Sequence, residues 1–345
     1  MFAVRFFVTV LLFHCCITAS AQQIQVLTQR PKVSLRGLSV VNDQIIWASG
    51  SQGSVARSTD GGKTFEWLTV KGFEQRDFRD IEAFDSHTAI IIAVAEPAII
   101  LKTKDGGKSW SKVFEDSTEG MFLDAMDFIG GNGVVIGDPI DGNAYIAVTK
   151  DSGDTWQHDP LQKNYLGLPM KIPLAKGEAF FASSGTNFKL LVWNKYGYSL
   201  VGASGGTHSS LFSESSIAST LPIIQGKEST GANSIAVYNN KQAVVVGGDF
   251  ANDKDSSQNC VLLSLKTKVQ YSFPKVSPHG YRSCVAYITG RKLITCGTSG
   301  VDISKDGGVN WSLISTESFH VCQKAKKGNR VFLAGKDGRI AMLLN

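Results

Sequence analysis

Short runs of β-branched and aliphatic residues alternate with glycine-rich breaks along most of the chain. Examples are the segments QIIWASGSQGSVARS, AIIIAVAEPAIILKT and GVVIGDPIDGNAYIAVT. Apolar runs of roughly four to eight residues that are bounded by turn residues are typical of β-strands. The pattern therefore predicts an all-β protein built from short strands and tight turns.

A motif of eight residues ends several of these strand groups. It reads STDGGKTF from Ser58, TKDGGKSW from Thr103, TKDSGDTW from Thr149 and SKDGGVNW from Ser304. The motif aspartates are Asp60, Asp105, Asp151 and Asp306, which lie 45, 46 and 155 residues apart. Self-similarity at such a period is typical of repeat architectures, and the last interval corresponds to three repeats.

The repeat predicts seven blades of a β-propeller. Their expected ranges are 34–69, 78–114, 122–159, 177–225, 232–273, 281–315 and 319–345. The last range shows only three strands, whereas the segment IQVLT near the N-terminus has no blade of its own. We expect this segment to complete the last blade, because a closed ring leaves no long sheet edge exposed. The predicted fold is one seven-bladed propeller of four-stranded antiparallel blades over residues 22–345.

The N-terminal residues have the pattern of a secretion signal. Arg5 is followed by the apolar run Phe6–Ile17 and by the small residues Ala19, Ser20 and Ala21. The sequence predicts a cleaved signal peptide over residues 1–21 and an exported, periplasmic or extracellular protein. The apolar run is shorter than the roughly 20 residues that span a bilayer, so no membrane span is expected.

The net charge of the chain argues against a nucleic-acid partner. The chain has a net charge of +5, and loss of Arg5 leaves about +4, which is too small to indicate a nucleic-acid partner. We expect a monomer.

The cysteines beyond the signal are Cys260, Cys284, Cys296 and Cys322. Cys284 and Cys296 flank a predicted turn symmetrically, so they could form a disulfide across a hairpin or remain unpaired in the core.

The repeated motif matches the Asp box, or BNR repeat. It resembles the repeats of sialidases, sortilin-like receptors and the photosystem II stability and assembly factor family. The motif aspartate can accept hydrogen bonds from backbone N–H groups of its own turn, the glycines permit positive φ, and the aromatic residue packs between sheets. We therefore assign a structural role to Asp60, Asp105, Asp151 and Asp306.

Segments outside the motif are most similar to bacterial exported relatives of the assembly-factor family. They include RGLSVV, FRDIEAF, GDP, GGD and GYRSCVAY. Some of these relatives carry the loose label oxidoreductase, but the sequence has no GxGxxG, CxxC or CxxCH motif. The resemblance implies a non-catalytic binding or assembly-assisting propeller. No cofactor and no metal are expected.

The predicted innermost strands all begin with a polar residue. Aligned by blade, these residues are Arg36, Arg79, Asp124, Glu178, Asn233, Arg282 and His320. Because innermost strands begin around the central channel of a propeller, we expect them to form a polar ring at one mouth. The loop between the second and third strands of a blade lies on the same face. It adds Asp138 and Asp249, which are alternatively ordinary turn-capping residues.

Three arginines are the most specific candidates for ligand binding in this ring. Guanidinium groups of Arg36, Arg79 and Arg282 could converge on a carboxylate, sulfate or phosphate, in partial resemblance to the arginine triad of sialidases. Alternatively, each arginine pairs with a neighbouring acid in a structural network. The candidate acids for such pairs are Asp80, Asp124 and Glu178.

Two functions remain open at the level of sequence. The first is an exported, non-catalytic propeller that holds a protein segment or an anionic ligand at the channel mouth. The second is a glycan-active hydrolase or lectin, which would need two carboxylates about 5–9 Å apart if it hydrolyses glycosides. The candidates for that catalytic pair are Asp124, Asp138, Glu178 and Asp249.

Overall fold

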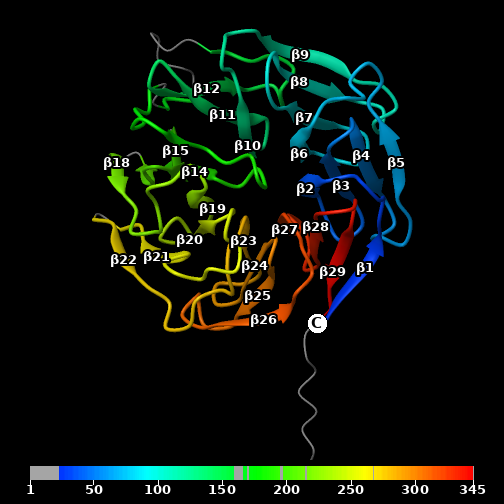
Figure 1. The fold of residues 1–345 in the computed structure, drawn as a ribbon. Coiled ribbons are helices and arrows are strands. Elements are labelled where there is room, and N and C mark those ends of the chain that lie inside the picture. Colours follow the sequence, from blue (N-terminus) through cyan, green and yellow to red (C-terminus); the bar gives the residue numbers. More distant parts are fainter. Residues whose placement is uncertain are drawn as a thin grey trace, which may run out of the picture.

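A computed structural model describes residues 23–158, 166–168, 171–194, 197–213, 216–266 and 268–344. Within these ranges the chain forms 29 β-strands and no α-helix. The strands belong to seven antiparallel sheets that are arranged as a ring (Figure 1). The predicted seven-bladed propeller is confirmed. No helix in the described ranges is long and apolar enough to cross a bilayer, and the predicted signal peptide lies outside them.

Each blade runs from an innermost strand at the channel to an outer strand at the rim. The innermost strands are β2 (Leu35–Val40), β6 (Phe78–Ala83), β10 (Leu123–Ile129), β14 (Phe188–Asn194), β19 (Thr230–Tyr238), β23 (Cys284–Tyr287) and β27 (Val321–Lys324). The second strands are β3 (Ile46–Gly50), β7 (Ala89–Ala93), β11 (Asn132–Ile140), β15 (Gly197–Ala203), β20 (Gln242–Asp249), β24 (Leu293–Gly297) and β28 (Val331–Ala334). The third strands are β4 (Ser54–Ser58), β8 (Ala98–Thr103), β12 (Asn143–Thr149), β17 (Ser210–Ser213), β21 (Cys260–Ser264), β25 (Gly300–Ser304) and β29 (Ile340–Leu343). The outer strands are β5 (Glu66–Thr69), β9 (Ser111–Asp116), β18 (Ser216–Thr220), β22 (Gln270–Ser272), β26 (Trp311–Ser315) and β1 (Ile24–Thr28).

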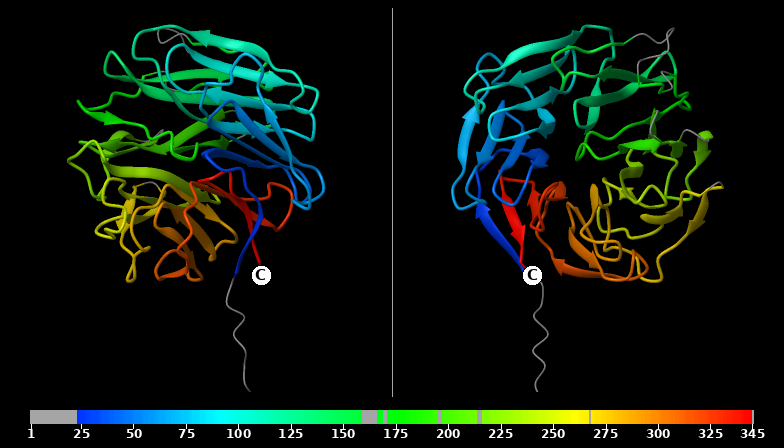
Figure 2. Two further views of the ribbon diagram at one scale, coloured as in Figure 1. Left: turned by 45° about the vertical axis from the view of Figure 1, so that its right-hand side comes forward. Right: turned by 180° about the vertical axis from the view of Figure 1, so that it is seen from behind.

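The two ends of the chain close the ring. Strand β1 pairs with β29, with Ile24 opposite Leu343, so the N-terminal strand completes the seventh blade as predicted. Both views of Figure 2 show these strands, in dark blue and red, side by side. Each innermost strand also contacts the innermost strand of the next blade, and β2 contacts β27. The ring is therefore closed through both its sheets and its hydrophobic core.

The third and fourth blades differ from the predicted pattern. The third sheet has three strands in the described residues, and isolated bridges to β12 join Asn143 with Pro173 and Val148 with Gln157. The fourth blade begins at β14, not at residue 178. The segment EAFFAS was therefore wrongly aligned as an innermost strand. Its first two residues form β13 (Glu178–Ala179), which pairs with β16 (Gly205–Gly206) in the sheet of the fifth blade.

Residues 180–187, which we call the channel plug, cross the middle of the ring before β14 begins. The plug reaches inner residues of several blades on opposite sides of the channel. Arg36 Nη1 donates to the Ser183 carbonyl (3.3 Å), the Ser183 hydroxyl donates to Asn233 Oδ1 (3.0 Å), and the Ser184 hydroxyl donates to the Ser283 carbonyl (2.7 Å). In Figures 1 and 2 the green chain leading into β14 extends toward the centre of the ring. The plug thus lies across the channel, in contact with inner residues of the first, fifth and sixth blades.

The Asp boxes hold the turns between third and fourth strands. In each motif the Ser or Thr hydroxyl donates to the aspartate at 2.8 or 2.9 Å, and the aspartate accepts a backbone N–H four residues later. The motif aromatics pack in clusters with residues of the preceding blade; these aromatics are Phe65, Trp110, Trp156 and Trp311. One short motif therefore fastens a turn and joins two blades.

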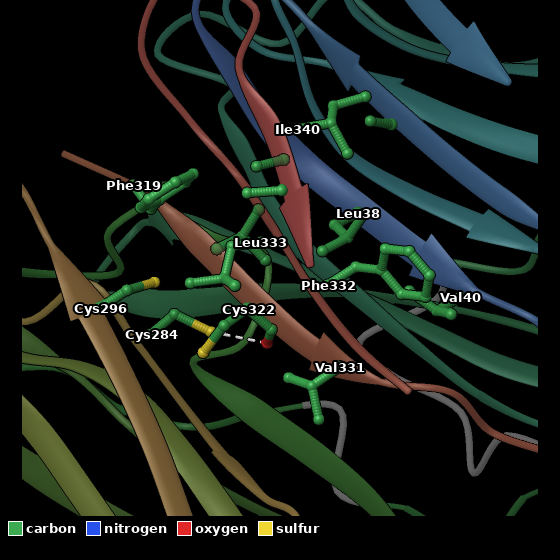
Figure 3. Packing of buried hydrophobic residues seen from close by; sticks show 14 of the residues in the cluster. Leu38, Val40, Cys284, Cys296, Phe319, Cys322, Val331, Phe332, Leu333 and Ile340 are labelled. Atoms are coloured by element: carbon green, nitrogen blue, oxygen red, sulfur yellow. Dashed lines mark hydrogen bonds between the residues drawn. The ribbon is translucent and has the colours of Figure 1, made fainter. Parts of the chain in front are cut away.

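Three buried cysteines meet where the sixth and seventh blades join (Figure 3). Cys284 lies opposite Cys296 across the β23–β24 hairpin, as the sequence predicted, and both are free. The Cys284 thiol donates to the Cys322 carbonyl at 3.3 Å. Of the two alternatives for this pair, the structure has the unpaired thiols, which pack with Phe319, Leu333 and their neighbours as core residues.

Candidate functional site

The polar ring predicted at the channel mouth has a structural origin in β-bulges. The register of β2, β6, β10 and β19 with its second strand skips one residue near the start. The skipped residues are Arg36, Arg79, Asp124 and Asn233. Since an extra residue in a bulge is left out of the ladder and re-aimed, the same device recurs in four blades at the position that the sequence marked as polar.

A cavity of about 530 Å³ opens at this mouth. Its polar lining consists of Arg36, Arg79, Asp138, Ser183, Asn233, Thr298 and His320. Its apolar and aromatic lining consists of Phe122, Ala179, Phe180, Phe181, Ala182, Phe250 and Tyr281. The plug residues form one wall, so the cavity is closed on that side by the chain itself.

Arg36 and Arg79 bring positive charge into the cavity. Burial and the neighbouring Arg79 lower the pKa of Arg36. The one ion pair of Arg79 among the described residues is a 3.4 Å contact with Asp77, and its Nε is buried without a hydrogen bond there. Burial, Arg36 and Arg79 lower the pKa of His320 to about 3, so its ring is neutral at physiological pH. Arg36 and Arg79 therefore present two guanidinium groups to the same cavity, and few acids neutralise their charge.

Asp138 and Asp124 form an acidic corner of the site. Asp138 is half-buried, lines the cavity, and accepts a hydrogen bond from the Phe180 amide at 2.9 Å. Asp124 is buried, and neither of its carboxylate oxygens has a well-formed hydrogen bond within the described residues. Burial and then the charge of Asp138 raise the pKa of Asp124 well above its usual range. Burial also raises the pKa of Asp138 to about 6.

Arg282 does not line the cavity, so the predicted cluster of three arginines is reduced to two. Its side chain is fully buried, and it pairs with the fully buried Asp302, with 2.7 Å between Arg282 Nε and Asp302 Oδ2. Its Nη1 donates to the Tyr281 carbonyl and the Ser299 hydroxyl. The alternative of a structural ion pair therefore applies to this arginine, although Asp302 was not among the acids considered.

Three predicted acids also lie in structural positions. Asp80 is buried and accepts the backbone amides of Ile81 and Met126, both at 2.8 Å. Glu178 is buried and accepts the Ala175 amide and the Ser204 hydroxyl. Asp249 accepts the Ala251 amide at 2.9 Å, which is the turn-capping alternative. None of the three is among the residues that line the cavity.

Asn233 lines the cavity but its amide group is engaged. Its Oδ1 accepts the Ser183 hydroxyl and, at 2.8 Å, the Tyr281 hydroxyl. Asn233 thus fixes the plug and one aromatic wall in place. Within the described residues, no group of three or more His, Cys, Asp or Glu side chains could hold a metal ion.

Sequence reasoning missed the aromatic half of the site. Phe250 is 49% exposed and contacts the rings of Phe181 and Tyr281 edge-on, at centroid distances of 5.8 and 6.3 Å. Phe122 lies under the guanidinium of Arg79 at 5.9 Å. The exposed Phe250 follows the glycines and aspartate of GGDFANDKD, and an aromatic residue in a polar loop is the signal that could have indicated it.

Comparison with known proteins supports the fold that these residues build. Residues 66–187 match the family model of the Photosynthesis system II assembly factor YCF48. A structure of YCF48 bound to D1 peptide is similar, with a TM-score of 0.61 and 18% identity over 94% of this chain and 97% of the other. The chain is a seven-bladed β-propeller, and part of it is similar to the YCF48 assembly factor.

Other solved propellers agree with this assembly-factor-like fold. YCF48 from Cyanidioschyzon merolae has a TM-score of 0.60 and 16% identity, over 94% of this chain and 99% of the other. The WD40 β-propeller domain of Doa1 has a TM-score of 0.60 and 12% identity, over 94% and 97% of the two chains. No curated protein matches the sequence. The arrangement of the blades is thus shared with other propellers.

Proposed function

We propose that this assembly-factor-like propeller is an exported, non-catalytic binding protein that holds a segment of a protein partner at the channel mouth. The observation that carries the proposal is the presence of Arg36 and Arg79 in one cavity with little neutralisation by acids. A guanidinium group binds carboxylates through paired hydrogen bonds, and its attraction is strengthened where water is partly excluded. The partner would supply an anionic group to this pair.

The apolar wall of the cavity supports a peptide rather than a small inorganic anion. Phe122, Phe180, Phe181 and Phe250 offer aromatic surface beside the arginines, and ligand sites that combine such surface with a few polar groups bind organic ligands. YCF48, one of the similar proteins, has been solved bound to D1 peptide, so the fold can hold a peptide. The signal-like N-terminus supports a location outside the cytoplasm, in the periplasm or the extracellular space.

The glycoside hydrolase alternative has less support. Its mechanism needs two carboxylates that both reach the substrate, but Asp138 is the one acid among the cavity-lining residues. Asp124, the nearest further candidate, is fully buried beside it. We therefore propose no catalytic pair among Asp124, Asp138, Glu178 and Asp249.

Binding to a peptide and small-anion array tests the proposal. The purified mature protein is compared with Arg36→Ala, Arg79→Ala and the double variant, and with Arg291→Ala, an exposed arginine outside the cavity, as the matched control. We expect specific binding that falls at least tenfold in each cavity variant and is unchanged in the control. Binding that survives in the double variant, or no binding by the folded protein, would contradict the proposed function.

A further inference from the structure

Asp138 is an acid that the proposed anion site does not need. It lies at the end of β11, before Pro139, and lines the same cavity as Arg36 and Arg79. Its Oδ1 accepts the Phe180 amide, whereas no hydrogen bond within the described residues reaches its Oδ2. No described lysine, arginine or histidine nitrogen lies within 4 Å of its carboxylate. The cavity therefore contains a carboxylate with one oxygen available to a ligand.

The charge of this acidic corner resides on Asp138 at neutral pH. Asp124, behind it on β10, is buried without a well-formed hydrogen bond, and burial and the charge of Asp138 keep its pKa well above its usual range. Asp138, with a pKa of about 6, is ionised at pH 7, whereas burial disfavours the charged form of Asp124. An unpaired carboxylate in a cavity with an aromatic wall is costly unless a positive group joins it.

A ligand with only negative charge would gain from the arginines but would be repelled by Asp138. The repulsion is significant because like charges interact strongly where water is excluded. A ligand that also carries a positive group satisfies both corners. We infer that the cavity selects a zwitterionic group, in which an ammonium that binds Asp138 is joined through an apolar body to a carboxylate that binds Arg36 and Arg79. This inference rests on the proposed function, since it concerns the same cavity.

Peptide chemistry supplies this combination in its smallest form. A short peptide with a free amine, a free carboxylate and an aromatic side chain would match the acidic corner, the arginine pair and the phenylalanine wall. The probes are Gly-Phe, its N-acetyl derivative, which lacks the ammonium, and its C-terminal amide, which lacks the carboxylate. Titration calorimetry at pH 7 measures their affinities, because the α-amino group is still mostly protonated there.

We expect Gly-Phe to bind at least tenfold more tightly than either derivative. In Asp138→Asn the amide oxygen can still accept the Phe180 amide, but the charge is lost, so N-acetylation should no longer weaken binding. In Arg36→Ala the penalty for C-terminal amidation should fall instead. Asp141→Asn is the matched control, because Asp141 lies in the same β11–β12 turn but outside the cavity lining, and it should behave as the wild type.

A pH series provides a second readout. Asp138 shares the cavity with Arg36, Arg79 and His320 and lies beside the buried Asp124, and His320, with a pKa of about 3, is neutral between pH 7 and pH 5. Protonation of Asp138 through its pKa of about 6 should therefore reduce the advantage of Gly-Phe over its N-acetyl derivative as the pH falls, and Asp138→Asn should show no such change.

Two results would overturn the inference. If the N-acetyl derivative binds as tightly as Gly-Phe and Asp138→Asn has no effect, the site takes anions alone, and the proposed function stands without the acidic subsite. If none of the three probes binds to the folded protein, the zwitterion hypothesis fails. The array with the arginine variants then decides the proposed function separately.

Discussion

The buried pair Arg282–Asp302 offers the clearest test of where the structure departs from the sequence prediction. Both side chains are fully buried, and Arg282 donates to Asp302, to the Tyr281 carbonyl and to the Ser299 hydroxyl. Arg282→Met removes the cation and leaves Asp302 buried with the His279 side chain and backbone amide as partners. Removal of one member of such a pair costs about 3–5 kcal/mol, because the buried charge that remains loses the ion that neutralised it.

The expected loss of unfolding free energy should be measurable as a lower Tm. An unfolding entropy of about 2.1 cal/mol/K per residue over roughly 320 residues makes 1 kcal/mol equal to about 1.5 °C, so Tm should fall by about 4–7 °C. Arg36→Met makes the same chemical change in the cavity. Because Arg36 makes one 3.3 Å hydrogen bond in the described residues and is disfavoured by Arg79, its Tm should stay within about 2 °C of the wild type.

The assay is differential scanning calorimetry or fluorimetry on both variants, with peptide binding measured in parallel. The double variant Arg282→Met/Asp302→Leu should be more stable than Arg282→Met alone, because it removes the orphaned charge. An Arg282→Met protein that melts like the wild type but loses ligand binding would refute the reasoning. In that case Arg282 would belong to the site, as the sequence suggested.

Three further predictions concern the Asp box, the plug and the buried acids. Thr103→Val leaves the buried Gly107 amide without its 2.9 Å hydrogen bond and should lower the free energy of unfolding by about 1–3 kcal/mol in a denaturant titration, with ligand affinity unchanged. Gly185→Ala would place a Cβ 2.2 Å from the Asp80 carboxyl carbon at a φ of 65°, and should destabilise the protein by roughly 2 kcal/mol or more in the same titration; wild-type stability would contradict the close packing of the plug. Burial raises the pKa of Asp124 in the folded state, so the folded protein retains a proton that the unfolded chain releases above about pH 3.9. The stability that this retained proton contributes is present below that pH and is lost as the pH rises toward the folded pKa of Asp124. The unfolding free energy, measured as a function of pH, should therefore decline less steeply in Asp124→Asn than in the wild type.

The fold was predictable because its signals are local and repeated. Each Asp box fixes a turn with its own residues, and hydrogen bonds led by the Thr64 and Ser109 hydroxyls lower the pKa of Asp60 and Asp105 to about 2. The motif spacing then sets the blade length, and the leftover strand IQVLT indicates how the ring closes. Arg36, Arg79 and Asn233 were placed at the channel mouth by the same alignment, since each is the extra residue of a bulge near the start of an innermost strand.

The partners of those residues were not predictable from the same pattern. Arg282 occupies the aligned position in the sixth blade, yet the nearby Asp302 on β25 neutralises it. Asp302 lies in the strand that leads into the Asp box, where its neighbours in sequence give no indication of a buried ion pair. Whether an arginine faces a cavity or an acid depends on contacts between strands, and the spacing along one strand carries no information about them.

The fourth blade shows how a local exception creates the site. EAFFAS has the polar start and apolar run of an innermost strand, but the chain uses these residues to enter the channel, and β14 takes the innermost position instead. Gly185 permits this path, because its positive φ and missing Cβ let the plug pass against Asp80. The consequence is chemical as well as structural. Phe180 and Phe181 become the apolar wall, the Phe180 amide fixes Asp138, and the Ser183 carbonyl holds Arg36. The plug thus supplies one wall of a partly open cavity that an arginine pair and a single carboxylate share.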